Sequence, residues 1–104
     1  SRGLGDVYKR QAINDINKAI ELDPQNVNYW VEKGGVCLRV NQTAEAVQAL
    51  EKAISIDSQN APAYRMLGYI QVQQKQTEKG IANLKKAKEL GDEVAIGLLE
   101  KYSK

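Results

Sequence analysis

The sequence contains no histidine and a single cysteine, Cys37, among its 104 residues. Without histidine, the common general acid–base pairs, Cys–His nucleophiles and most zinc ligand sets are excluded. A single thiol cannot close an internal disulfide. The acidic residues are scattered along the chain rather than clustered, as solvated surface carboxylates usually are. We therefore predict that the chain is not an enzyme and that it holds no cofactor and no metal ion.

Long apolar runs are also missing from the sequence. No stretch of about 18 consecutive apolar residues occurs, so no membrane-spanning segment is predicted. Hydrophobic residues make up 42% of the chain and charged residues 27%. This balance is typical of a globular domain rather than of a disordered chain.

A period of 34 residues is the strongest pattern in the chain. The stretch NKAIELDPQN, which ends at Asn26, recurs as EKAISIDSQN, which ends at Asn60. Within each period apolar residues recur at i, i+4 and i+7, and this spacing predicts two amphipathic helices per unit. The same step of 34 links Ile13, Val47 and Ile81; Ile16, Leu50 and Leu84; Ala19, Ala53 and Ala87; Leu22, Ile56 and Leu90; Trp30 and Tyr64; and Gly34 and Gly68.

Polar segments mark the ends of the predicted helices. Residues 41–43 and 75–77 separate the two helices of each unit, and residues 23–26 and 57–60 separate one unit from the next. Each of the latter two segments ends in an asparagine, which is placed to cap the following helix. Small residues are expected to let two helix backbones approach closely at Gly34, Ala46, Gly68 and Gly80.

Together these residues resemble the tetratricopeptide repeat (TPR), a family whose 34-residue unit is a helix–turn–helix. The family pattern is an aromatic residue, Leu-Gly and a second aromatic residue, followed by Ala, a large apolar residue, Ala and Pro. The resemblance implies an all-α fold: a right-handed solenoid of antiparallel helix pairs with a C-terminal capping helix. The matching residues are Ala12, Ile16, Ala19 and Pro24 in the first unit; Trp30, Gly34, Cys37, Ala46, Leu50 and Ala53 in the second; and Tyr64, Leu67, Gly68, Gly80, Leu84 and Ala87 in the third.

The chain departs from the family pattern at four positions. Lys33 stands where the family has leucine, and it is expected to be costly unless its stem packs and its amine reaches solvent. Gln71 replaces an aromatic residue and Ser58 replaces proline. Gly80 replaces alanine inside a helix, which lowers helix propensity by about 1 kcal/mol.

The register of the repeat also sets the expected boundaries. Gly91 and Asp92 are placed to end one helix and to cap the next. The apolar face of the last helix is expected to consist of Val94, Leu98, Leu99 and Tyr102. The expected segments are 12–26, the second half of a truncated unit; 27–60 and 61–94, two complete units; and 92–104, a capping helix.

The first eleven residues, SRGLGDVYKRQ, do not follow the period. Tyr8 lies only four residues before Ala12, whereas nine residues separate Cys37 from Ala46, so no turn between two helices fits here. The segment resembles the in-frame translation of a transposase adapter used to prepare DNA sequencing libraries. This resemblance implies that residues 1–11 are a non-native extension and that the chain is a C-terminal fragment of a longer repeat protein.

The extension is nevertheless expected to be helical. Leu4, Tyr8 and Ala12 share one helical face with Ile16, so a single helix is predicted to run from this segment into the first repeat. Because the partner helix of the truncated unit is missing, the isoleucines of this helix are expected to be partly bare; they are Ile13, Ile16 and Ile20.

The extension also carries the whole net charge of the chain. The chain has a formal net charge of +2, whereas residues 12–104 hold 12 basic and 12 acidic residues. No basic stripe follows the predicted helices, so we expect no nucleic-acid partner.

The family resemblance implies a non-catalytic scaffold that binds a partner protein or peptide in a concave groove lined by the first helix of each unit. In this groove Arg65 offers charge-assisted hydrogen bonds to a carboxylate, and Met66 and Tyr69 offer apolar contact. Carried over by register, the groove residues are Asn28, Val31, Glu32, Gly35 and Arg39 in the second unit, and Pro62, Arg65, Met66, Tyr69 and Gln73 in the third.

Some members of the family grip the C-terminal carboxylate of a chaperone with lysine and asparagine in this groove. Val31 and Gly35 occupy those positions in the second unit, and Pro62 and Met66 occupy them in the third. A chaperone-tail clamp is therefore not expected. Two alternatives to a binding scaffold stay open: a structural repeat segment of a larger protein, or an accessory array on an enzyme whose catalytic domain lies upstream.

Overall fold

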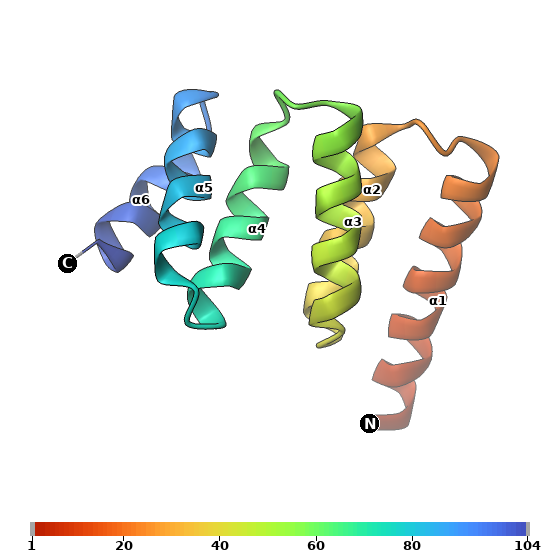
Figure 1. Cartoon of the computed structure of the whole chain (residues 1–104). Helices are drawn as coiled ribbons and strands as arrows, with labels where there is room; N and C mark the ends of the chain where they lie inside the picture. Colours follow the sequence, from red (N-terminus) through yellow and green to blue (C-terminus); the bar gives the residue numbers. More distant parts are fainter. Residues whose placement is uncertain (1, 104) are drawn as a thin grey trace.

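The computed structural model describes residues 2–103 of the chain. Figure 1 shows the helices standing next to one another in chain order, with the two termini at opposite ends of the array. The all-α fold is thereby confirmed. No helix within residues 2–103 is both long enough and apolar enough to cross a membrane. The helices of this range are α1 (Arg2–Leu22), α2 (Val27–Arg39), α3 (Thr43–Ile56), α4 (Ala61–Gln73), α5 (Thr77–Glu89) and α6 (Glu93–Tyr102).

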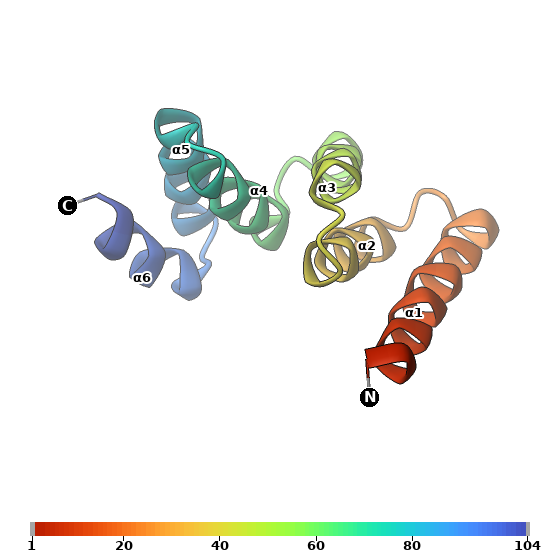
Figure 2. The same ribbon diagram turned by 90° about the horizontal axis from the view of Figure 1, so that it is seen from below.

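The helices pack as pairs, and the pairs define an inner and an outer side. The most extensive packing joins α2 to α3 and α4 to α5, as expected for two complete helix–turn–helix units. The helix that opens one unit also touches the helix that opens the next, since α4 contacts both α2 and α6. Within the described range, α1, α3 and α5 make no contacts among themselves. The array therefore curves around α2, α4 and α6. Figure 2 shows these three helices following one another along one side of the array.

Side-chain caps start three of the helices. The Oδ1 atom of Asn26 accepts a hydrogen bond from the amide of Asn28 at 3.1 Å, and that of Asn60 accepts one from Ala63 at 3.0 Å. The Oδ1 atom of Asp92 accepts one from the amide N of Ala95 at 3.2 Å. Each bond satisfies an amide that the helix leaves unpaired, so the three predicted N-caps are confirmed.

The close packing of α4 against α5 explains why glycine stands at positions 68 and 80. A Cβ atom built on Gly68 would lie 2.7 Å from the carbonyl oxygen of Gly80, and one built on Gly80 would lie 2.7 Å from that of Gly68. The predicted close approach is thereby confirmed, and it gives Gly80 a packing reason that outweighs its low helix propensity. Beside this contact Leu84 is fully buried, as Leu50 is in the preceding unit.

The core consists of two clusters of buried residues between the helices. One cluster of buried residues joins α2, α3 and α4, and a second joins α5 and α6. The first consists of Cys37, Ala46, Leu50, Ala53, Ala63, Leu67 and Ile70, and the second of Leu84, Ala87 and Ala95.

The two aromatic residues of the repeat pattern tie the helices to the turns before them. Trp30 donates its indole N–H to the carbonyl of Pro24 at 2.8 Å, and the Tyr64 hydroxyl donates to the carbonyl of Ser58 at 3.0 Å. Lys33 is half-buried, and its Nζ atom lies 5.8 Å from the centroid of the Trp30 ring. The Lys33 amine thus has a favourable neighbour despite the departure from leucine.

The N-terminal helix is a single 21-residue helix, which confirms that prediction. The expectation that Ile16 is bare is wrong: this side chain is only 6% exposed, because α2 packs on this part of α1. Ile13 and Ile20 are partly buried.

The expected apolar face of α6 needs one correction. Val94 is 59% exposed, whereas its neighbour Ala95 is fully buried. The packed face therefore consists of Ala95, Leu98, Leu99 and Tyr102, which follow the spacing i, i+3, i+4 and i+7.

Candidate functional site

The candidate site is the inner side of the array, along which α4 contacts both α2 and α6. Four of the predicted residues form its apolar centre, which we call the inner patch: Val31, Gly35, Met66 and Tyr69. Val31, Met66 and Tyr69 are half-buried and pack against the core cluster below them. Gly35 and Met66 join the two helices, since a Cβ atom on Gly35 would lie 4.0 Å from the Met66 Sδ atom.

Arg65, predicted to hold a partner's carboxylate, has a carboxylate of this chain beside it. Its Nε atom donates to the Oδ2 atom of Asp92 at 2.8 Å, and the two side chains are 27% and 8% exposed. Asp92 also caps α6 through its other oxygen, so it links α4 to the start of α6. The pair is neutral as a unit, which leaves less positive charge on the inner side than the sequence indicates.

Gln73 is the second predicted residue that contacts α6. Its Nε2 atom donates to the hydroxyl of Tyr102 at 2.9 Å, near the end of that helix. Together with the Arg65–Asp92 pair, this bond fixes both ends of α6 against α4. The two residues therefore shape the site by holding α6 in place.

The remaining predicted residues lie at the edges of the inner patch. Asn28 is exposed in the first turn of α2, and Pro62 is half-buried in the first turn of α4. Glu32 and Arg39 are exposed and line a cleft between α1 and α2. The structure thus brings four of the predicted residues into one surface and divides the others between α6, the cleft and the helix ends.

Sequence reasoning missed the contribution of α6 to the inner side. When the N-cap Asp92 is aligned with Asn60, Leu98 takes the register of Met66 and Lys101 takes that of Tyr69. Lys101 is exposed, and its Nζ atom lies 5.6 Å from the centroid of the Tyr102 ring. The signal was the N-cap itself, which marks α6 as the first helix of a further unit rather than only a cap.

Among the described residues, no three His, Cys, Asp or Glu side chains gather as a metal site would require. Cys37 is fully buried; burial, reinforced by the nearby Glu45 carboxylate, raises the pKa of its thiol. A buried thiol with a raised pKa is a poor nucleophile.

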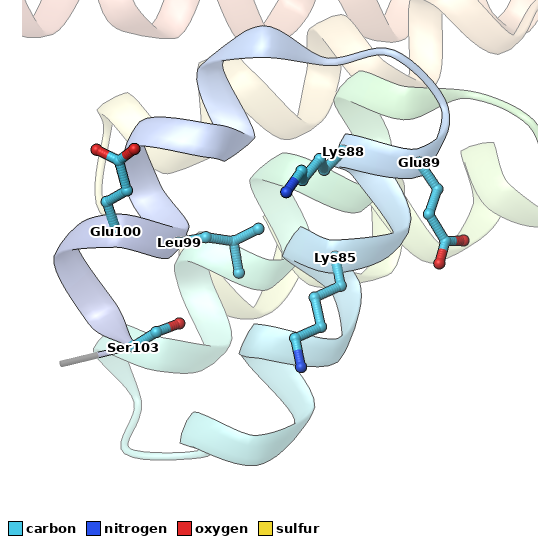
Figure 3. Close-up of a pocket in the computed structure, with 6 residues that line it drawn as sticks. All are labelled: Lys85, Lys88, Glu89, Leu99, Glu100 and Ser103. Carbon is cyan, nitrogen blue, oxygen red and sulfur yellow. The ribbon is translucent and has the colours of Figure 1, made fainter.

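A separate hollow lies between α5 and α6, with a volume of about 580 Å³. Leu99 projects into it between the two helices (Figure 3). The hollow lies outside the inner patch. It is lined by Lys85, Lys88, Glu89, Leu99, Glu100 and Ser103.

The helices form pairs that repeat along the chain, and the first helix of each pair contacts the first helix of the next. This arrangement defines an α-helical repeat array. Two models of the tetratricopeptide repeat match the chain, over residues 38–99 and over residues 4–26. The first covers more than half of the chain, so this protein belongs to the tetratricopeptide repeat family and is a protein-interaction repeat domain. A comparison with curated proteins found no match.

Solved structures share this fold. The TPR domain of Arabidopsis OM64 superposes with a TM-score of 0.88 at 21% identity, over 98% of this chain and 86% of that one. The first TPR of Spaghetti (RPAP3), bound to the HSP90 peptide SRMEEVD, gives 0.85 at 19% identity, over 98% and 82%. MamA gives 0.76 at 26% identity over 80% of this chain, and the chain spans only 48% of MamA.

Proposed function

We propose that this protein is a non-catalytic scaffold that binds an extended or helical segment of a partner protein along the inner side of α2, α4 and α6. The observation that carries the proposal is the inner patch, a half-exposed apolar surface at the contact between α2 and α4. Met66 and Tyr69 supply adaptable and aromatic contact there, which are the usual anchors of an interface. Lys101 adds one exposed positive charge at the end formed by α6.

The charge of this surface favours an apolar partner segment with few acidic residues. Arg65 already holds Asp92, so a partner carboxylate at this point would compete with an internal one. In the second unit Val31 and Gly35 offer no positive charge. We therefore keep the expectation that a chaperone tail is not the partner; the peptide SRMEEVD, which the RPAP3 domain binds, is the direct control.

Peptide selection followed by site-directed variants tests the proposal. Random peptides displayed on phage are selected on the immobilised chain, and their affinities are then measured with soluble variants. Tyr69→Ala and Val31→Ala are expected to weaken the selected peptides about tenfold or more, as truncation of a buried anchor does. The matched control is Lys52→Ala, an exposed residue of the outer helix α3, and it should leave the affinity unchanged. Peptides that respond to Lys52→Ala but not to Tyr69→Ala would contradict the proposal. Tight binding of SRMEEVD would contradict the expectation that a chaperone tail is not the partner.

A further inference from the structure

Gly35 of the inner patch is a glycine that neither the backbone nor the packing requires. It lies inside α2 with a negative φ, since the one glycine of positive φ among the described residues is Gly91. Apart from α2 itself, the only described atom within 4 Å of a Cβ built on Gly35 is the Sδ atom of Met66, at 4.0 Å. That distance is ordinary van der Waals contact, so alanine would fit here and would also favour the helix.

The other glycines within the two complete units differ from Gly35 because packing explains them. A Cβ atom on Gly34, Gly68 or Gly80 would lie only 2.6 or 2.7 Å from its nearest neighbour in the facing helix. The repeat does not call for glycine at position 35 either, because its counterpart 34 residues later is Tyr69. Where α4 carries a large side chain, α2 therefore carries none. We call the space above Gly35 in the inner patch the Gly35 notch.

The side chains around the Gly35 notch are apolar. Val31 lies one turn before Gly35 on the same face of α2, and Met66 lies across from it on α4. Tyr69 follows Met66 by three residues, so it lies on the same face of α4. All three side chains are half-buried and pack against the core cluster, which leaves their outer atoms available to a partner.

Charged side chains of the two helices are engaged elsewhere. Glu32 and Arg39 of α2 line the cleft between α1 and α2. Arg65 of α4 donates to the carboxylate of Asp92 at 2.8 Å, and this pair is neutral as a unit. A partner group that enters the Gly35 notch therefore meets apolar side chains rather than an ionic partner.

We propose that the Gly35 notch holds an aromatic side chain of the partner segment, and that Gly35 thereby determines which residue the inner patch selects. The Met66 Sδ atom is the nearest side-chain atom to the notch, and thioether sulfur packs favourably on aromatic rings. The Tyr69 ring adds aromatic contact. This inference deepens the proposed function and rests on it, because a partner must first bind along the inner side.

A single added methyl group tests the notch. Peptides selected on the wild-type chain should share one aromatic position, and Gly35→Ala in the chain should weaken them about tenfold because the methyl group takes up part of the notch. The same variant should have a higher thermal midpoint, because alanine favours the helix. The matched control is Gly5→Ala in α1, where nothing lies within 4 Å of the Cβ position, and it should leave the affinity unchanged.

Two further measurements connect Gly35 to the aromatic residue of the peptide. When that residue is replaced by alanine, Gly35→Ala should no longer change the affinity, because the notch is then empty in both chains. A second selection on Gly35→Leu should yield peptides without the aromatic preference.

Three results would overturn the inference and leave the proposed function intact. The first is unchanged affinity in Gly35→Ala for peptides that Tyr69→Ala weakens. The second is the same aromatic preference in peptides selected on Gly35→Leu. The third is a lower thermal midpoint of Gly35→Ala, because this would give the glycine a packing reason. If neither Tyr69→Ala nor Val31→Ala weakens any selected peptide, the proposed function fails and the inference fails with it.

Discussion

The substitution Gly68→Ala tests the helix packing on which the site depends. The added Cβ atom would lie 2.7 Å from the Gly80 carbonyl oxygen, 2.9 Å from Cγ of Leu84 and 3.1 Å from its amide nitrogen. Two of these atoms belong to the backbone of α5, so the helices must separate to make room. Overpacking of this kind costs about 3 kcal/mol at the upper end of its range, and the helix propensity of alanine returns about 1 kcal/mol. The free energy of unfolding should fall by about 2 kcal/mol.

Two other glycines supply matched comparisons. In Gly34→Ala the new Cβ atom meets only side-chain atoms of Leu50, at 2.6 and 2.7 Å, and a side chain can shift. We expect a loss of about 1 kcal/mol or less. Gly97 of α6 has nothing within 4 Å of its Cβ position, so Gly97→Ala should gain about 0.5–1 kcal/mol from helix propensity alone.

Urea denaturation followed by circular dichroism at 222 nm measures all three variants. The predicted order of stability is Gly97→Ala above the wild type, then Gly34→Ala, then Gly68→Ala, with similar slopes against urea. A Gly68→Ala variant as stable as the wild type would refute the packing argument, since no backbone contact would then limit the approach of α4 and α5.

Four further substitutions or measurements follow from single contacts. Asp92→Asn should cost about 1 kcal/mol because it retains the cap of α6 and loses only the ion pair, and Asp92→Ala should cost more in the same urea assay. Trp30→Phe should cost about 1 kcal/mol through the lost hydrogen bond to the preceding turn; no change in midpoint would show that this bond contributes nothing. Lys75 has a φ of 66°, so Lys75→Gly should raise the thermal midpoint by relieving the left-handed backbone, and a lowered midpoint would contradict this. Burial raises the pKa of the Cys37 thiol, so at pH 8 it should react with a thiol reagent only as urea unfolds the chain, and rapid labelling of the folded chain would refute its burial.

Much of the fold could be predicted because the repeat fixes both the period and the helix ends. Asn26 and Asn60 mark helix starts in the sequence because capping is local chemistry, and the structure has the caps where expected. The close contact at Gly68 was likewise foreseeable from its register. The register predicts a close approach at Gly80 as well, but the atom that its Cβ position faces, the Gly68 carbonyl oxygen at 2.7 Å, comes from the structure alone.

The candidate site was less predictable because side-chain pairing depends on neighbours far along the chain. Arg65 and Asp92 are 27 residues apart, and nothing in the local sequence shows that they meet. The sequence predicts the start of α6 correctly from Asp92, but Val94 and Ala95 are neighbours, and only the packing of α6 on the preceding helices shows that Ala95 is buried and Val94 is exposed. The contribution of α6 to the inner side follows from aligning Asp92 with Asn60, and the 34-residue period alone does not show it.

The most direct test of the proposed function is a map of the bound surface. A ¹⁵N-labelled sample of the chain is titrated with a selected peptide, and amide chemical-shift changes are recorded along all six helices. The largest changes are expected to cluster on α2, α4 and α6 around Val31, Gly35 and Tyr69, and to disappear in Tyr69→Ala. Changes confined to α3 and α5, or left intact by Tyr69→Ala, would contradict the proposed function.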